Sequence, residues 1–142
     1  MWRRQWVFPL LILAFLHWGC AQMQALGGMD SLTKLLTSQL GVTSNQATGG
    51  VGSMLSLAKE RLPGMDFNTL TALIPGADSF MKSARDLGAV TGPVGDQAGL
   101  TSAFSRLGMG PDMVPKFTGT VSDFVGNAGG EPAKKIAAAA FK

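Results

Sequence analysis

Glycine and proline interrupt this sequence so often that only short helices can form between them. Within the intervals, apolar residues recur at three- and four-residue spacing, as in a helix that buries one face. No run of alternating apolar and polar residues is long enough to indicate a strand. We therefore predict an all-α fold: a compact bundle of about six to seven short helices with Gly/Pro turns, after an N-terminal signal segment.

The interval from residue 30 to 62 shows this organisation most clearly. Gly41 can end a first helix, because helices commonly end on a glycine in the left-handed conformation. Thr43 and Gln46 have the spacing of a capping box, which predicts the start of a second helix. Pro63 cannot continue that helix and therefore ends it. The segment is predicted to be a helix, a glycine turn and a longer helix.

Three glycines, Gly49, Gly50 and Gly52, fall inside the second helix of this segment. Each is expected to cost about 1 kcal/mol relative to alanine. One interpretation is that the missing side chains allow a close crossing, so that the glycines mark a helix-packing or interaction surface. The other is that the helix begins only after Gly52 and that a flexible loop precedes it. A phosphate-binding loop is disfavoured, because the lysine of that motif is absent.

The rest of the chain also reads as short helices separated by glycine and proline. Pro-Gly-x-Asp recurs at Pro63 and Pro75, each time before a predicted helix. Residues 88–99 are predicted to be a loop of about a dozen residues, and residues 126–130 are predicted to end a helix that opens near Pro111. Glu131 and Pro132 then start the last helix. The helix after Pro75 is expected to face the core with Phe80, Met81, Ala84 and Leu87.

Two parts of the chain match at an offset of 67 residues. Leu40-Gly41-Val42 aligns with Leu107-Gly108-Met109, and apolar positions of the following helices then coincide. These pairs are Ala47 with Val114, Met54 with Val121, and Leu57 with Phe124. An internal duplication would produce this match, and so would any helix–glycine–helix corner.

Residues 1–21 differ from the rest of the chain. Arg3 and Arg4 precede an apolar run, and small residues follow it, which is typical of a secretory signal peptide. The run is shorter than the roughly 20 residues that a membrane span needs, although an uncleaved N-terminal anchor is an alternative. We predict a tether over residues 22–29 and a single helical domain over residues 30–142.

The signal segment can be processed in two ways. Cys20, which follows Gly19, resembles the lipid-attachment cysteine of bacterial lipoproteins, although His17 and Trp18 fit the residues before such sites poorly. Alternatively, cleavage follows Ala21. The protein is thus expected to be exported, either free in the periplasm or lipid-anchored to the envelope through Cys20. Membrane contact is expected only through the signal segment or the lipid.

Composition excludes several function classes. Loss of Arg3 and Arg4 with the signal segment lowers the formal net charge from +3 to +1. No basic patch with interleaved aromatic residues remains, so we do not expect nucleic-acid binding. After residue 21 the chain has no His, Cys, Trp or Tyr, which removes the common general base, thiol nucleophile and imidazole or thiolate metal ligands. We expect no catalytic, cofactor-binding or metal-binding residue and no cofactor.

Acidic side chains could still support a carboxylate-dependent hydrolase, which is a distant alternative. However, aspartates recur where helices are predicted to begin, and helix capping explains them. These aspartates are Asp30, Asp66, Asp78 and Asp112. Glu60, Asp86 and Asp123 are predicted to form weak surface pairs with neighbouring bases, drawn from Lys59, Arg61, Lys82 and Arg85.

Two function hypotheses remain. The first is a non-enzymatic helical module of the bacterial envelope that binds a protein partner or an apolar ligand. The second is a structural, self-associating protein, in which exposed methionine and phenylalanine side chains form a homo-oligomer. Methionines at helical spacing are also ordinary core residues, because their flexibility fills irregular gaps.

Three short motifs together carry a family resemblance. They are Gln-Leu-Gly-Val at residues 39–42, Gly-Gly-Val-Gly at residues 49–52, and Leu-Gly-x-x-Pro-x-Met-Val at residues 107–114. In this combination the chain, from about Asp30 to Lys142, resembles a bacterial family of uncharacterised exported proteins named after VcgC/VcgE. The resemblance implies a bacterial, envelope-associated helical domain. It implies no activity and no catalytic residues.

Overall fold

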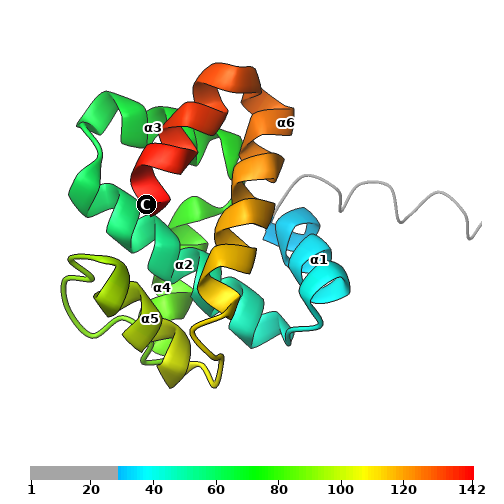
Figure 1. Ribbon diagram of the computed structural model, residues 1–142, viewed down its shortest axis with the longest axis vertical. Coiled ribbons are helices and arrows are strands. Elements are labelled where there is room, and N and C mark those ends of the chain that lie inside the picture. Colours follow the sequence, from blue (N-terminus) through cyan, green and yellow to red (C-terminus); the bar gives the residue numbers. More distant parts are fainter. Residues whose placement is uncertain (1–28) are drawn as a thin grey trace, which may run out of the picture.

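The computed structural model describes residues 29–142, and every regular element in this range is a helix (Figure 1). The prediction of an all-α fold is therefore confirmed. Predictions about the signal segment, Cys20 and the tether concern residues outside the described range, except at Met29, which was assigned to the tether and instead begins the first helix. The helices are α1 (Met29–Leu40), α2 (Ser44–Arg61), α3 (Gly64–Leu73), α4 (Ala77–Asp86), α5 (Gln97–Arg106) and α6 (Met113–Phe141).

Helix α2 begins with the predicted capping box. The Thr43 N–H donates to Gln46 Oε1 over 3.0 Å, and the Gln46 N–H donates to Thr43 Oγ1 over 3.1 Å. The helix then continues through all three glycines to Arg61, so the alternative of a loop before Ser53 is wrong. Pro63 lies just beyond its end, as expected for a residue that cannot extend a helix.

Helix α2 is also the centre of the fold, because it packs against each of the other five helices. Most of its residues between Ala47 and Ala58 are buried. The core continues into α5 and α6, where the rings of Phe104 and Phe117 meet edge to face with centroids 4.9 Å apart. In Figure 1, α2 runs through the middle of the molecule with the other helices around it.

Aspartates do not cap the helices as predicted. Asp66 and Asp78 lie inside the first turns of α3 and α4, whose N-cap residues are Pro63 and Gly76. Asp112 occupies the N-cap position of α6, but its side chain makes no capping hydrogen bond. At these places a carboxylate interacts with the positive end of the helix dipole. Asp30 similarly lies in the first turn of α1.

The aspartate that does cap a helix was missed. The Asp96 side chain accepts a hydrogen bond of 2.9 Å from the Gly99 N–H at the start of α5. Because α5 begins at Gln97, the predicted loop over residues 88–99 is shorter than expected and spans residues 87–96. Leu87 follows the last residue of α4 and is 38% exposed, so its expected place in the core is wrong.

Helix α6 contains two helical parts that the sequence predicts as separate helices. The first ends inside the predicted segment of residues 126–130, at Gly130, where φ is +76° and ψ is −167°, and the last part starts at Glu131 and Pro132 as predicted. Gly129 allows a close approach to α3, because a Cβ there would lie 2.6 Å from Leu73 Cδ1. After the break, the last part of α6 turns back onto the bundle and buries Phe141 (Figure 1).

Candidate functional site

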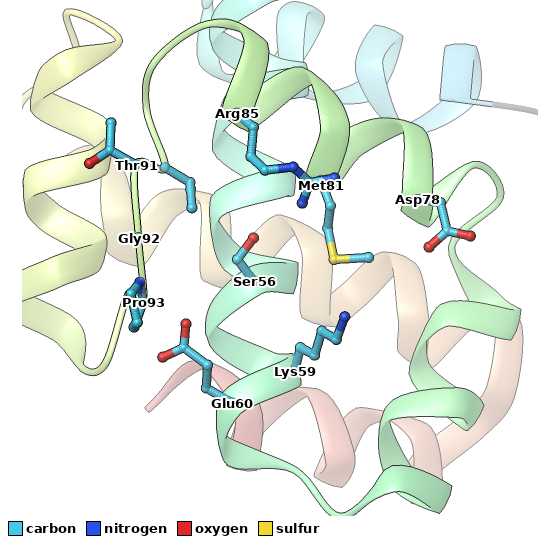
Figure 2. Close-up of a pocket in the computed structure, with 10 residues that line it drawn as sticks. Ser56, Lys59, Glu60, Asp78, Met81, Arg85, Thr91, Gly92 and Pro93 are labelled. Carbon is cyan, nitrogen blue, oxygen red and sulfur yellow. The ribbon is translucent and has the colours of Figure 1, made fainter.

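A surface groove of about 660 Å³ lies between α2, α4 and the loop of residues 87–96 (Figure 2). The two helices each contribute side chains from one face. Residues 56, 59 and 60 of α2 and residues 78, 81 and 85 of α4 have the spacing of neighbours on a helix surface. The residues that line it are Ser56, Lys59, Glu60, Asp78, Met81, Arg85, Val90, Thr91, Gly92 and Pro93.

The third wall of the groove is held to α2 by Glu60. One carboxylate oxygen of Glu60 accepts from the Val94 N–H over 2.7 Å, and the other accepts from the Gly95 N–H over 2.6 Å. Hydrogen bonds to an ionised acceptor are stronger than those between neutral groups. The predicted role of Glu60 in a surface pair with Lys59 or Arg61 is therefore wrong: Glu60 binds the loop backbone.

The loop is also held from its other side. The Nη1 group of Arg106, in α5, donates two hydrogen bonds to the loop. One goes to the Ala89 carbonyl over 3.1 Å and the other to Thr91 Oγ1 over 3.3 Å. Ala89 is completely buried, which fixes the start of the loop in the core. The loop is thus attached to α2 through Glu60 and to α5 through Arg106. Its position beside the groove follows from these contacts rather than from any regular structure of its own.

Three charged side chains around the groove have no partner among residues 29–142. The Lys59 ammonium, the Arg85 guanidinium and the Asp78 carboxylate make no hydrogen bond or ion pair within this range. Figure 2 shows Arg85 and Lys59 on opposite sides of the space between α2 and α4, with Met81 between them and Asp78 beyond Met81. The uncommitted charges are therefore spread along the groove, because α2 and α4 run antiparallel: Gly49 of α2 faces Leu87, just after α4, and Gly52 faces Phe80.

The other predicted surface pairs have mixed outcomes. Asp86 pairs with Lys82 one helical turn away, as predicted. Asp123 pairs instead with Lys134, over 3.2 Å, from the opposite side of the break at Gly130. That pairing could not be read from sequence neighbours, because it depends on the chain reversing direction between the two residues.

The glycines singled out from the sequence lie inside the fold and not in the groove. Gly49, Gly50 and Gly52 are all buried. A Cβ on Gly52 would lie 1.9 Å from the Phe80 carbonyl oxygen, and one on Gly50 would lie 2.5 Å from Phe117 Cε1. The absence of side chains at these glycines thus lets α2 pack closely against α4 and α6.

Few large apolar side chains reach the surface of residues 29–142. Met65 is 83% exposed and Leu87 is 38% exposed, and these are the two exposed large hydrophobic residues in that range. Met54, Met81 and Met109 are buried and contribute to the core. The described part of the chain thus uses most of its methionines as packing residues.

Two further properties of the described chain bear on its chemistry. Within residues 29–142, no group of three or more His, Cys, Asp or Glu side chains could hold a metal ion. None of the described helices combines the length and the hydrophobicity that crossing a membrane requires. Cys20, the candidate for lipid attachment, lies outside this range.

Sequence reasoning did not identify the groove. Lys59, Glu60 and Arg85 were noted only as exposed charges, and Asp78 only as a cap. No local pattern links position 60 with position 94, because the two residues meet only after α3 and α4 have folded back on α2 (Figure 1). The sequence does contain one indication of the loop contact. The backbone N–H groups near Pro93 lie outside any predicted helix, so each needs a hydrogen-bond acceptor from elsewhere in the fold.

Comparison with known proteins assigns the chain to a family. Residues 19–142 match the family described as "Protein of unknown function VcgC/VcgE (DUF2780)". Searches of curated proteins and of solved structures found no similar chain. The match covers the whole helical domain, including the glycine turns at Gly41 and Gly108 and every residue of the groove. The chain therefore belongs to the VcgC/VcgE family of proteins of unknown function.

Proposed function

We propose that this protein is a non-enzymatic binding module of the bacterial envelope and that the groove between α2, α4 and the 87–96 loop receives a partner protein. The envelope location rests on the signal segment predicted from residues 1–21, with anchoring through Cys20 or release after Ala21. The observation that carries the proposal is a groove whose loop wall is held in place by Glu60 and Arg106 and whose lining includes the uncommitted cations Lys59 and Arg85. Binding sites typically place a few polar groups on a preformed concave surface.

A protein partner suits this groove better than an apolar ligand. Pockets for small apolar molecules are lined mainly by hydrophobic and aromatic side chains. Here Met81, Val90 and Pro93 are the large apolar side chains in the lining, and no aromatic residue contributes. Charged and hydroxyl side chains supply most of the remainder. Such a mixed, open surface is typical of contacts between proteins, whose rims are polar.

Hydrolysis is less well supported than binding, although two carboxylates line the groove. A carboxylate pair that acts as acid and base needs both groups available to the reacting atoms. Both oxygens of Glu60 are engaged by the loop N–H groups, so Asp78 remains as the uncommitted acid of the lining. Self-association through exposed Met and Phe side chains also finds little support, because Met65 and Leu87 supply the exposed large apolar surface of residues 29–142.

The proposal can be tested by site-specific cross-linking in the native envelope. A photoreactive residue at Gly92 would face open space beside the groove, since a Cβ there meets no atom within 4 Å. The same residue at Gly64, which also has open space and lies at the start of α3, is the matched control. We expect a defined protein adduct from position 92 and none from position 64.

Mass spectrometry of the adduct decides between the hypotheses. A second polypeptide that disappears when Lys59 and Arg85 are both replaced by glutamate supports partner binding in the groove. An adduct of twice the mass of this chain would instead support the homo-oligomer. Equal adducts from both positions, or none from position 92, would overturn the proposal.

A further inference from the structure

We propose that the end of α6 holds the loop wall of the groove in place, so that detachment of this segment releases the loop. The segment comprises residues 131–142, after the break at Gly130, and we call it the strap. The inference rests on the proposed function in treating the 87–96 loop as the wall of a binding groove. It adds a regulatory device, because any change that detaches the strap would alter the shape of the groove.

The end of the strap is bound by side chains from two other helices. The last carbonyl groups of a helix receive no hydrogen bond from within that helix. Arg61 Nη1 donates to the Lys142 carbonyl over 2.6 Å, and Gln97 Nε2 donates to the Phe141 carbonyl. Because Arg61 is the last residue of α2 and Gln97 is the first of α5, the strap joins the end of α2 to the start of α5.

Arg61 lies directly beside the residue that holds the loop to α2. That residue is Glu60, whose two carboxylate oxygens accept from the N–H groups of Val94 and Gly95. The strap and the loop are therefore attached to consecutive residues of α2. A shift of the end of α2 would disturb both attachments at once.

Gln97 lies directly beside the residue that joins the loop to α5. Asp96 caps α5 by accepting from the Gly99 N–H over 2.9 Å, and its own N–H donates to the Val94 carbonyl over 2.9 Å. The first turn of α5 also packs tightly against the loop, since a Cβ on Gly99 would lie 1.8 Å from the Val94 carbonyl oxygen. A displacement of Gln97 would therefore be transmitted to the loop.

These contacts form a closed ring of three segments that are far apart in the chain. The segments are the end of α2 at residues 60–61, the loop and the start of α5 at residues 94–97, and the end of the strap at residues 141–142. Loss of the strap removes the acceptors of Arg61 and Gln97. Segments that open together in native proteins are contiguous units of this kind, so we expect the strap and the loop to open as one unit.

The strap is anchored mainly at the end that belongs to the ring. Its buried side chains are those of Ala133, Ala137, Ala140 and Phe141. The contribution of a buried side chain grows with its apolar area, so Phe141 contributes more than any of the alanines. A helix as short as the strap is also unstable by itself in water. Detachment at Phe141 is therefore expected to unfold the strap, and a substitution that weakens its helix should promote detachment.

The alternative is that these contacts add only to the overall stability of the fold. In that case the loop opens while the strap stays docked, and weakening the strap leaves the loop unchanged. Native-state hydrogen exchange separates the two cases, because an amide that exchanges through local opening reports only on the segment that opens.

The test compares two lysine-to-glycine substitutions in the full-length protein without any partner. Lys135 is exposed near the middle of the strap, and Lys34 is exposed near the middle of α1, which is not part of the ring. Replacing a lysine inside a helix by glycine weakens the helix, which corresponds to about threefold faster exchange through its opening. For Lys135→Gly, we expect the Ala137, Val94 and Gly95 amides to exchange about threefold faster.

For Lys34→Gly, we expect the exchange rates of the Val94 and Gly95 amides to remain unchanged. The amide of Leu55, in the buried middle of α2, reports on unfolding of the whole domain. Its exchange should become about threefold faster in both variants, which checks that they destabilise the fold equally. Val94 and Gly95 amides that change in both variants, or in neither, would overturn the inference.

The reciprocal experiment weakens the loop contact and observes the strap, because coupling between two sites acts equally in both directions. We expect Glu60→Gln to speed exchange of the Ala137 amide by the same factor as that of the Val94 amide. Glu131→Gln, which keeps the helix propensity of the strap, is the control. An unchanged Ala137 amide in Glu60→Gln would show that the strap and the loop open independently, which contradicts the inference.

These measurements need no ligand, so their outcome is separate from that of the cross-linking at Gly92. A defined adduct at Gly92 together with independent opening of the strap would retain binding in the groove and reject its regulation by the strap. Joint opening without an adduct would retain the coupled device and reject the groove as a binding site.

Discussion

Helices α2 and α6 carry matching sequence patterns but place very different demands on the residues that match. At the offset of 67 residues, Met54 of α2 corresponds to Val121 of α6, and both are completely buried. Gly52 corresponds to Gly119 at the same offset. A Cβ on Gly52 would collide with the Phe80 carbonyl, whereas one on Gly119 would meet nothing within 4 Å.

A second pair of matching positions explains this difference. Gly50 corresponds to Phe117, and the two are in direct contact, because a Cβ on Gly50 would lie 2.5 Å from the phenylalanine ring. The aromatic side chain of α6 thus packs where α2 has no side chain. Helix α2 is central and surrounded, so its glycines are needed for close contacts. Helix α6 packs against α1, α2, α3 and α5, but Gly119 lies on an exposed part of its surface. The atoms next to a glycine, rather than the sequence pattern, therefore set whether the glycine is needed.

Replacement of Gly52 by alanine tests this contrast most directly. We expect the free energy of unfolding to fall by about 3 kcal/mol, the upper end of the usual cost of overpacking, because the obstacle is a backbone carbonyl that cannot rotate away. Urea denaturation followed by circular dichroism measures the change.

Gly119→Ala is the matched control, because it makes the same chemical change at the corresponding position of α6. There we expect stabilisation of about 0.5–1 kcal/mol, since alanine favours the helix and nothing obstructs its methyl group. Equal effects of the two substitutions would contradict the contrast between the helices.

Replacement of Gly130 by alanine tests the break that lets the end of α6 return to the core. The backbone at Gly130 has φ of +76° and ψ of −167°, a conformation that glycine adopts readily and other residues do not. We expect a loss of about 2 kcal/mol. The fluorescence of a tryptophan introduced at Phe141 would report local detachment, and an unchanged signal together with unchanged stability would argue against the assigned role.

Glu60→Gln tests the contact between α2 and the loop. A glutamine carbonyl can accept from one N–H, but its amide group cannot accept from the other, so we expect a loss of about 1 kcal/mol. Hydrogen exchange of the Val94 and Gly95 amides should become faster. Glu131→Gln, an exposed substitution in α6, should leave both amides unchanged.

Asp123→Asn tests the corresponding carboxylate contact on α6. Asp123 pairs with Lys134 across the break, and both side chains are largely exposed. Such pairs contribute little in water, so we expect a change within about 0.5 kcal/mol. A loss larger than that of Glu60→Gln would show that the surface pair, rather than the loop contact, is the more important of the two.

Much of the fold could be predicted because its signals are local. The capping box at Thr43 and Gln46, the glycine turn at Gly41 and the end of α2 before Pro63 each depend on residues a few positions apart. The prediction that aspartates cap the helices was wrong for a related reason. Asp66 and Asp78 stand near helix starts, but Pro63 and Gly76 already begin those helices, so the carboxylates fall inside the first turn.

The candidate groove could not be predicted, since its residues come from three separate elements. Lys59 and Glu60 have similar surroundings in the sequence, yet Glu60 binds the loop and Lys59 remains uncommitted. What separates them is the position of Val94 and Gly95 after folding. The same applies to Asp123, whose partner Lys134 is brought near by the break at Gly130.

The sequence by itself determined that the described chain is helical, where most helices begin and end, and which faces are apolar, because these depend on backbone preferences and short-range spacing. The tertiary structure decided which glycines are indispensable, which carboxylate holds the loop, and where two cations are left free beside a groove. These properties depend on contacts between residues far apart in the chain, and such contacts exist only once α2 has been surrounded by the other helices.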